Sequence, residues 1–199
     1  SLIQGSFHLA KFKNIVDRLF IMTEQYLKEG AASGRVLAKI KDYERITDNM
    51  HKEIHRFLSM LAENQLTQNQ SKTLMQYLKL ADELECIADY LDKIASYNTR
   101  YIQSGENVKW RDDFMIFFTE IKDFYFLVTQ NTPVMPEVDP KKINILAQKL
   151  KISADALREE HLRRLSSTEG SALGLMTYSD MVVCLRKIRG HTLKLHKAL

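Results

Sequence analysis

Residues 80–95 carry two parallel stripes of side chains, and this pattern limits the chain to a helical structure over that stretch. The apolar side chains recur at steps of three and four residues, which is the period of one buried helix face. They are Leu84, Ile87, Ala88, Leu91, Ile94 and Ala95. Four acids recur in the same way about one residue further round: Asp82, Glu85, Asp89 and Asp92. Like charges at these spacings repel by roughly 0.2–0.5 kcal/mol per pair, so we expect either a cation beside the stripe or exposure to solvent.

A second acidic pair lies earlier in the chain. Glu44 and Asp48 stand four residues apart beside another apolar face, just as Glu85 and Asp89 do. Four residues is about one helical turn, so each pair points its carboxylates the same way. If the two helices are antiparallel neighbours, the four carboxylates meet, and hard cations, iron and manganese accept such oxygen ligands.

We therefore predict a metal site at Glu44, Asp48, Glu85 and Asp89, with Asp82 and Asp92 as outer candidates. The competing interpretation is a solvated acidic face whose charges are paired with Lys or Arg.

His51 and His55 share one helix face at the i,i+4 spacing of many metal ligands. They do not form a zinc-protease helix, because there the glutamate directly follows the first histidine. Here Glu53 comes two residues after His51, about 200° round the helix. His51 does continue the line of Glu44 and Asp48 and would extend their site; otherwise the two are surface histidines.

The whole chain favours long helices. It has 199 residues with only 7 Gly and 3 Pro. A fold of many short strands would need more of these turn-forming residues. The apolar periodicity predicts helices over 7–28, 33–63, 72–102, 110–129, 141–165 and 172–196. All three prolines fall in a predicted linker, 131–140. The predicted fold is all-α: six helices in two consecutive antiparallel three-helix bundles.

The two halves read as an internal repeat of about 100 residues, which we divide into domains 1–105 and 106–199. The apolar frame around Leu84 and Ile87 returns at Leu185 and Ile188. The acids do not return, since Arg186 stands at the position of Glu85 and Gly190 at that of Asp89. Asp155 keeps an acid on the preceding helix, but Lys151 occupies the position where its partner acid is expected. The second half therefore has a degenerate motif, and we expect no metal there.

Composition narrows the setting. The chain has two cysteines, Cys86 and Cys184, which lie far apart in the sequence. We therefore expect no disulfide framework, and this cysteine usage fits a reducing compartment. No run of 18 apolar residues and no signal peptide is visible. The first residues, which lack Met, read as a cut or processed end, so we expect a soluble piece of a longer protein that could include a membrane part.

Several kinds of chemistry lack support. There is no nucleophile elbow, no Gly-rich phosphate loop and no Glu-x-x-His pair of the ferritin-like di-iron enzymes. No nucleic-acid-binding module is recognisable.

The aromatic row of helix 110–129 has core spacing, with an oligomer face as the alternative: Phe114, Phe117, Phe118 and Phe124. The basic run of helix 172–196 would suit phosphate or an anionic membrane surface, or is simply solvated: Arg186, Lys187, Arg189, His191, Lys194 and Lys197.

These motifs bear a family resemblance. The sequence Glu85-Cys86-Ile87-Ala88-Asp89 resembles the Leu-Glu-Arg-Ile-Gly-Asp signature of PhoU proteins, regulators of bacterial phosphate uptake. The pair Glu44 and Asp48 resembles the family's companion Glu-x-x-x-Asp on the neighbouring helix. Segments 157–165 and 185–191 resemble the PhoU-like tail of bacterial sodium/phosphate cotransporters.

The resemblance covers essentially the whole chain and implies a function. It implies a non-enzymatic regulatory domain in phosphate uptake, most simply the cytoplasmic tail of a sodium/phosphate cotransporter, tethered to the inner membrane through a preceding transporter region. It also implies metal, often iron, on the four acids of the first half. Its implied partners are the membrane transporter domain and other copies of the chain. The alternatives are a free-standing PhoU regulator of a transporter and its sensor kinase, or a metal-dependent enzyme on a helical scaffold.

Overall fold

The computed structural model describes residues 1–30, 34–105, 109–130, 138–167 and 171–199. This described part contains six helices and no strand, which confirms the all-α prediction. The helices are α1 (Leu2–Glu29), α2 (Gly34–Ala62), α3 (Gln68–Gln103), α4 (Lys109–Thr129), α5 (Pro140–Ser166) and α6 (Ala172–Ala198). None of these helices, over the residues described, combines the length and the apolar character needed to cross a membrane.

Two helices begin earlier than the apolar pattern indicated, and capping explains both. The side chain of Ser1 accepts a hydrogen bond from the backbone N–H of Gln4, and the Gln4 side-chain oxygen accepts one from the N-terminal amino group of Ser1. Thr67 and Gln70 form the same reciprocal arrangement at the start of α3. Such a capping box satisfies N–H groups that have no partner within the helix. Helix formation therefore extends beyond the stretch that has a buried face.

The predicted linker 131–140 falls largely outside the described residues. Its described end shows how α5 begins. Asp139 is the N-cap, and its carboxylate accepts a hydrogen bond from the backbone N–H of Lys141 at 3.0 Å. Pro140 occupies the first helical position, where its missing N–H costs nothing.

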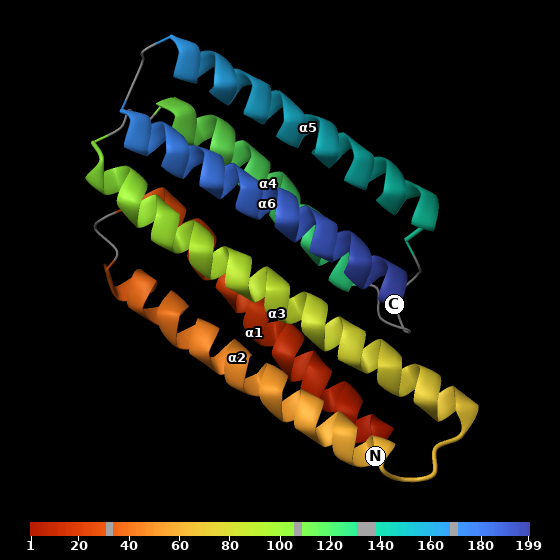
Figure 1. Ribbon diagram of the computed structural model, residues 1–199. Coiled ribbons are helices and arrows are strands. Elements are labelled where there is room, and N and C mark those ends of the chain that lie inside the picture. The colour runs from red at the N-terminus through yellow and green to blue at the C-terminus, as the bar shows by residue number, and fades with distance from the viewer. Residues whose placement is uncertain (31–33, 106–108, 131–137, 168–170) are drawn as a thin grey trace.

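The helices form two three-helix bundles that lie against each other (Figure 1). Helices α1, α2 and α3 contact one another, and α6 contacts both α4 and α5. The most extensive contact between any two helices is α3 with α6, which run side by side between the outer helices α2 and α5. The two bundles are therefore joined along their length, and the domain division at residue 105 remains a prediction.

The α3–α6 contact includes polar links between the bundles. His191 Nδ1 lies 2.5 Å from Glu83 Oε2, and both side chains are largely buried. Gln76 donates to the backbone carbonyl of Ala198. A buried carboxylate needs such a partner, because desolvating an unpaired charge is costly.

The other contact between the bundles is made by α1 and α4. The Phe20 ring stacks on Tyr125 with 4.4 Å between ring centroids. Tyr125 donates its hydroxyl to Asp17 at 2.8 Å, and Lys122 forms an ion pair with Glu24 at 2.6 Å. Burial and the nearby Asp17 charge raise the pKa of Tyr125 well above its usual range, so this hydroxyl stays protonated and remains a donor.

The aromatic row of α4 is core, as its spacing predicted. All four predicted members are at most 2% exposed: Phe114, Phe117, Phe118 and Phe124. Their burial uses the apolar face of α4 inside the molecule, so these four rings are not available to an oligomer face.

We expect Leu84→Ala in α3 and Ile188→Ala in α6 each to lower the free energy of unfolding by about 2–5 kcal/mol. The two side chains are 4% and 0% exposed, so truncation leaves a cavity. Urea unfolding monitored by circular dichroism measures the change. Ile145→Ala in α5, where the side chain is 57% exposed, is the matched control. A core variant that unfolds like the parent would show that its helix is rotated from the phase described.

Candidate metal centre on the first bundle

Helices α2 and α3 face each other through a line of polar side chains that we call the polar seam. Two contacts fix its register: Lys41 Nζ lies 2.6 Å from Asp92 Oδ1, and His51 Nε2 lies 2.8 Å from Asp82 Oδ1. Residue numbers thus rise along α2 as they fall along α3, and the helices are antiparallel. The middle of the seam holds Glu44 and Asp48 from α2 with Glu85 and Asp89 from α3.

The charges in the middle of the seam act on one another. Burial raises the pKa of Glu44, and the negative charges of Asp92, Asp89 and Asp48 raise it further, against the lowering effect of Lys41. The sequence prediction that the two acidic pairs come together across antiparallel helices therefore agrees with the electrostatics of the seam.

Glu85 has the same environment from the other helix. Burial is the largest cause that raises its pKa, and the charges of Asp89, Asp48 and Glu44 add to it, while His51 lowers it. A carboxylate in such surroundings is stabilised either by a proton or by a cation. The donor set of four carboxylate groups fits a hard cation.

The four acids nevertheless do not converge on one point. Among the described residues, none of them belongs to a group of three whose ligand atoms all lie within 4.8 Å of one another. Asp48 instead forms an ion pair with Lys52 at 2.8 Å. A cation held here would require the carboxylates to rotate toward it, and Asp48 to leave Lys52.

The second bundle has an ion pair where the first has acids. Arg186, at the position equivalent to Glu85, lies 3.6 Å from Asp155 of α5. Arg186 thus supplies a fixed positive charge to the one acid that the repeat retains. This pairing supports the expectation that the second half holds no cation.

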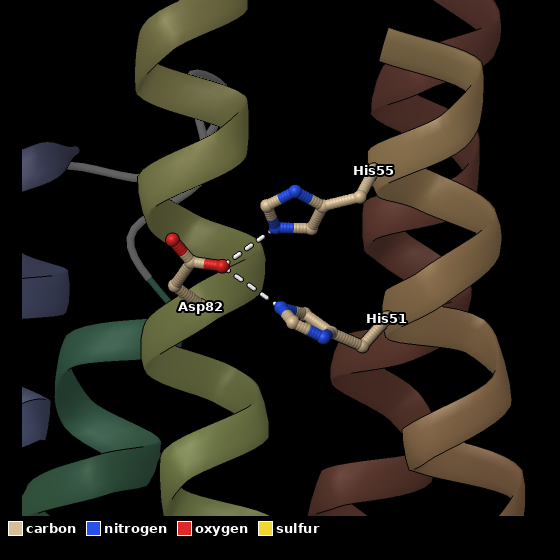
Figure 2. Close-up of side chains that lie close together, drawn as sticks. All are labelled: His51, His55 and Asp82. Carbon is tan, nitrogen blue, oxygen red and sulfur yellow. Dashed lines mark hydrogen bonds and ion pairs between the residues drawn. The ribbon is translucent and has the colours of Figure 1, made fainter. Parts of the chain in front are cut away.

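The end of the seam gathers three residues that the sequence did not place together. His51 Nε2 and His55 Nε2 lie 2.8 Å and 2.6 Å from the same atom, Asp82 Oδ1 (Figure 2). Burial alone would raise the pKa of Asp82, but its hydrogen bonds to the two histidines outweigh that effect and lower it. His51 was expected to extend the acidic pair of α2 and Asp82 to be an outer ligand of the same site; the structure instead joins them to each other.

The other outer candidate, Asp92, ends the seam at the opposite side. Lys41 contacts both Asp92 and Ser96 at 2.6 Å. Asp92 is thus paired with a lysine, as expected if the acids form a solvated face rather than a metal site. The seam therefore passes from a neutralised pair, through four acids, to a histidine cluster.

The basic run of α6 is partly used inside the molecule. Arg189 donates to the carbonyl of Ala147 at 3.3 Å, His191 contacts Glu83, and Arg186 pairs with Asp155. Two of the three remaining basic side chains, Lys187 and Lys194, border a shallow hollow of about 470 Å³ together with Tyr90, Val183 and Gly190. An anionic surface would thus meet fewer available charges than the sequence suggested.

The fold defines the class of this protein as a helical protein with two repeated three-helix bundles, the first of which carries the polar seam. Residues 9–97, which make up most of the first bundle, match the family model of the PhoU domain. Among solved structures, the crystal structure of PhoU from Pseudomonas aeruginosa aligns with a TM-score of 0.64 over 99% of this chain and 94% of that one, at 15% identity. That likeness extends the PhoU fold to both bundles. Comparison with curated protein sequences gave no match.

We expect Glu85→Gln to stabilise the cation-free protein at neutral pH. The raised pKa means that the folded chain binds this proton more tightly than the unfolded chain does. The stabilising contribution of that proton is present at acid pH and is lost as the pH rises through the raised pKa. The charged carboxylate therefore opposes folding at neutral pH, and glutamine removes that effect.

Urea unfolding in the presence of a chelator, between about pH 4 and about pH 7, measures this difference. It should shrink toward acid pH. Glu53→Gln, an exposed acid on α2, is the control. A Glu85→Gln variant less stable than the parent at neutral pH would contradict the repulsion.

Proposed function

We propose that this chain is a non-enzymatic regulatory domain in inorganic phosphate homeostasis. The PhoU-domain match over residues 9–97 is the observation that carries the proposal. The likeness to PhoU from Pseudomonas aeruginosa over nearly the whole of both chains supports it. The protein acts by contacting a phosphate transporter or its sensor rather than by transforming a substrate.

The particular setting that we propose is the cytoplasmic tail of a sodium/phosphate cotransporter. Support comes from the segments of α5 and α6 that resemble such tails and from the loss of the acids in the second half. In this setting the transporter part of the same polypeptide is the partner and tethers the domain to the inner membrane. Basic residues of α6 such as Lys187 and Lys194 would then lie toward an anionic membrane surface. A free-standing regulator is the alternative within the same class.

The gene itself distinguishes these two settings. Several apolar segments of about 20 residues encoded upstream of Ser1 would identify a transporter tail, and a start codon close to Ser1 would identify a free-standing regulator. An activity screen of the metal-loaded protein tests the third candidate, a metal-dependent enzyme.

We expect removal of residues 1–199 in the native host to leave phosphate uptake active but insensitive to phosphate supply. The reason is that a regulatory domain limits transport without forming the transport path. Uptake of labelled phosphate, in cells grown with scarce and with abundant phosphate, measures both rate and response. Unchanged uptake under both conditions would contradict the proposal.

The metal proposal concerns the middle of the seam. Glu44, Asp48, Glu85 and Asp89 hold a hard or borderline cation, with iron or manganese favoured. The cation offsets the burial and the charge repulsion that together raise the pKa of Glu44 and Glu85. Its role is to fix α2 against α3. The second bundle, with Arg186 beside Asp155, holds none.

We expect the parent to retain iron or manganese after loading and dialysis, and Glu85→Gln/Asp89→Asn to lose it. Two of the four carboxylates are then neutral and bind a hard cation poorly. Elemental analysis gives the metal content per chain. The control is Asp42→Asn/Glu53→Gln, which neutralises two exposed acids of α2.

Equal metal content in the parent and in Glu85→Gln/Asp89→Asn would contradict the proposal that these four acids bind the cation. Metal that is instead lost on changing Asp155, in α5, would place it in the second bundle.

A further inference from the structure

The histidine cluster at the end of the polar seam, His51, His55 and Asp82, has the geometry of a second cation site that differs from the four acids. Three ligand atoms, His51 Nε2, His55 Nε2 and Asp82 Oδ1, all lie within 4.8 Å of one another. Among the residues that the structure describes, no other three potential ligand atoms of His, Cys, Asp or Glu side chains lie this close together. From this geometry we propose that His51, His55 and Asp82 bind a borderline divalent cation, for which Zn²⁺ is the best fit.

The chemistry of the donors selects the cation. Two imidazole nitrogens and one carboxylate oxygen form a ligand set that Zn²⁺ commonly adopts, with water in the remaining position. Magnesium and calcium prefer oxygen ligands alone. The cluster should therefore prefer zinc, whereas the four acids of the seam should prefer a hard cation.

The two helices position these donors before any ion binds. His51 and His55 stand one turn apart on α2, and their ring centroids are 4.5 Å apart. Asp82 reaches across from α3, and Figure 2 shows both rings directed at the same carboxylate oxygen. Ordering three side chains costs conformational entropy, and here much of that cost is met by the fold.

Binding requires the Asp82 carboxylate to move slightly away from the two imidazole rings. Ligands about 2.0–2.1 Å from a tetrahedral zinc ion lie roughly 3.3 Å apart, against 2.6 Å and 2.8 Å for the present contacts. The side chains are 24%, 38% and 52% exposed for His51, His55 and Asp82, so they have room to separate. An ion between them would replace the hydrogen bonds that now join the rings to the carboxylate.

The cluster is open to an approaching ion. His55 and Asp82 form part of the wall of a shallow hollow of about 480 Å³. Water in this hollow can supply the remaining coordination positions. Lys79 and Gln76 also line it.

This site is separate from the acidic one. Glu85 is one turn from Asp82 on α3 but is not a member of the three-residue group. Zinc binding at the cluster therefore does not depend on the proposed function or on the metal at the four acids. The two sites would share one seam and take different cations.

Titration of the chelator-treated protein with ZnCl₂, followed by isothermal calorimetry, tests the proposal. We expect one zinc per chain in the parent. His51→Ala, His55→Ala and Asp82→Ala should each lower zinc affinity by more than the roughly 10–100-fold that follows loss of an outer-shell partner. His8→Asn changes an exposed histidine of α1 and should leave the affinity unchanged.

A crossed measurement separates the two sites. Glu85→Gln/Asp89→Asn should keep zinc at the cluster, and the histidine variants should keep whatever iron or manganese the parent holds. Zinc bound equally by the parent and the histidine variants would overturn the proposal, as would zinc lost only from the acid variant. Each variant is first compared with the parent by thermal unfolding in chelator, and His51→Gln and His55→Gln replace any alanine variant that does not fold.

Discussion

The packing of α3 holds this molecule together. It contacts α1 and α2 within its own bundle and α6 of the other bundle. Three alanines at seven-residue intervals, Ala81, Ala88 and Ala95, are at most 1% exposed. Such small side chains let a neighbouring helix approach closely, and the surrounding leucine and isoleucine side chains fill the space between helices. With 36 residues, α3 is longer than its neighbours and spans the full contact with α6.

The polar seam is a consequence of that packing. Once the apolar stripe of α3 is buried, the acids one residue further round must face α2 at the edge of the contact. Consecutive residues show the division. Asp82 reaches His51 and His55 on α2, whereas Glu83 turns the other way and meets His191 on α6. Because successive side chains on a helix differ by about 100°, two neighbouring acids serve two different interfaces.

Periodicity was sufficient to predict the helices and the aromatic core, because both depend on spacing within one segment. It also indicated that Glu44, Asp48, Glu85 and Asp89 share one surface. It could not give the register between α2 and α3, which depends on how two helices slide along each other. For that reason the pairing of both histidines with Asp82 was missed, and so was the link between Glu83 and His191. The early starts of α1 and α3 were missed because capping, rather than burial, determines them. The signal was present in the spacing of Ser1 with Gln4 and of Thr67 with Gln70.

The antiparallel register of the seam restricts how this sequence can change its length. A substitution at one position, such as Lys41, alters a single contact across the seam. Deletion of one residue between Lys41 and His51 would rotate the two ends of that stretch by about 100° relative to each other and shift them by about 1.5 Å. The contacts of Lys41 with Asp92 and of His51 with Asp82 could then no longer form together. Along this stretch of α2, gene variants that add or remove a codon should therefore be eliminated far more often than variants that exchange one.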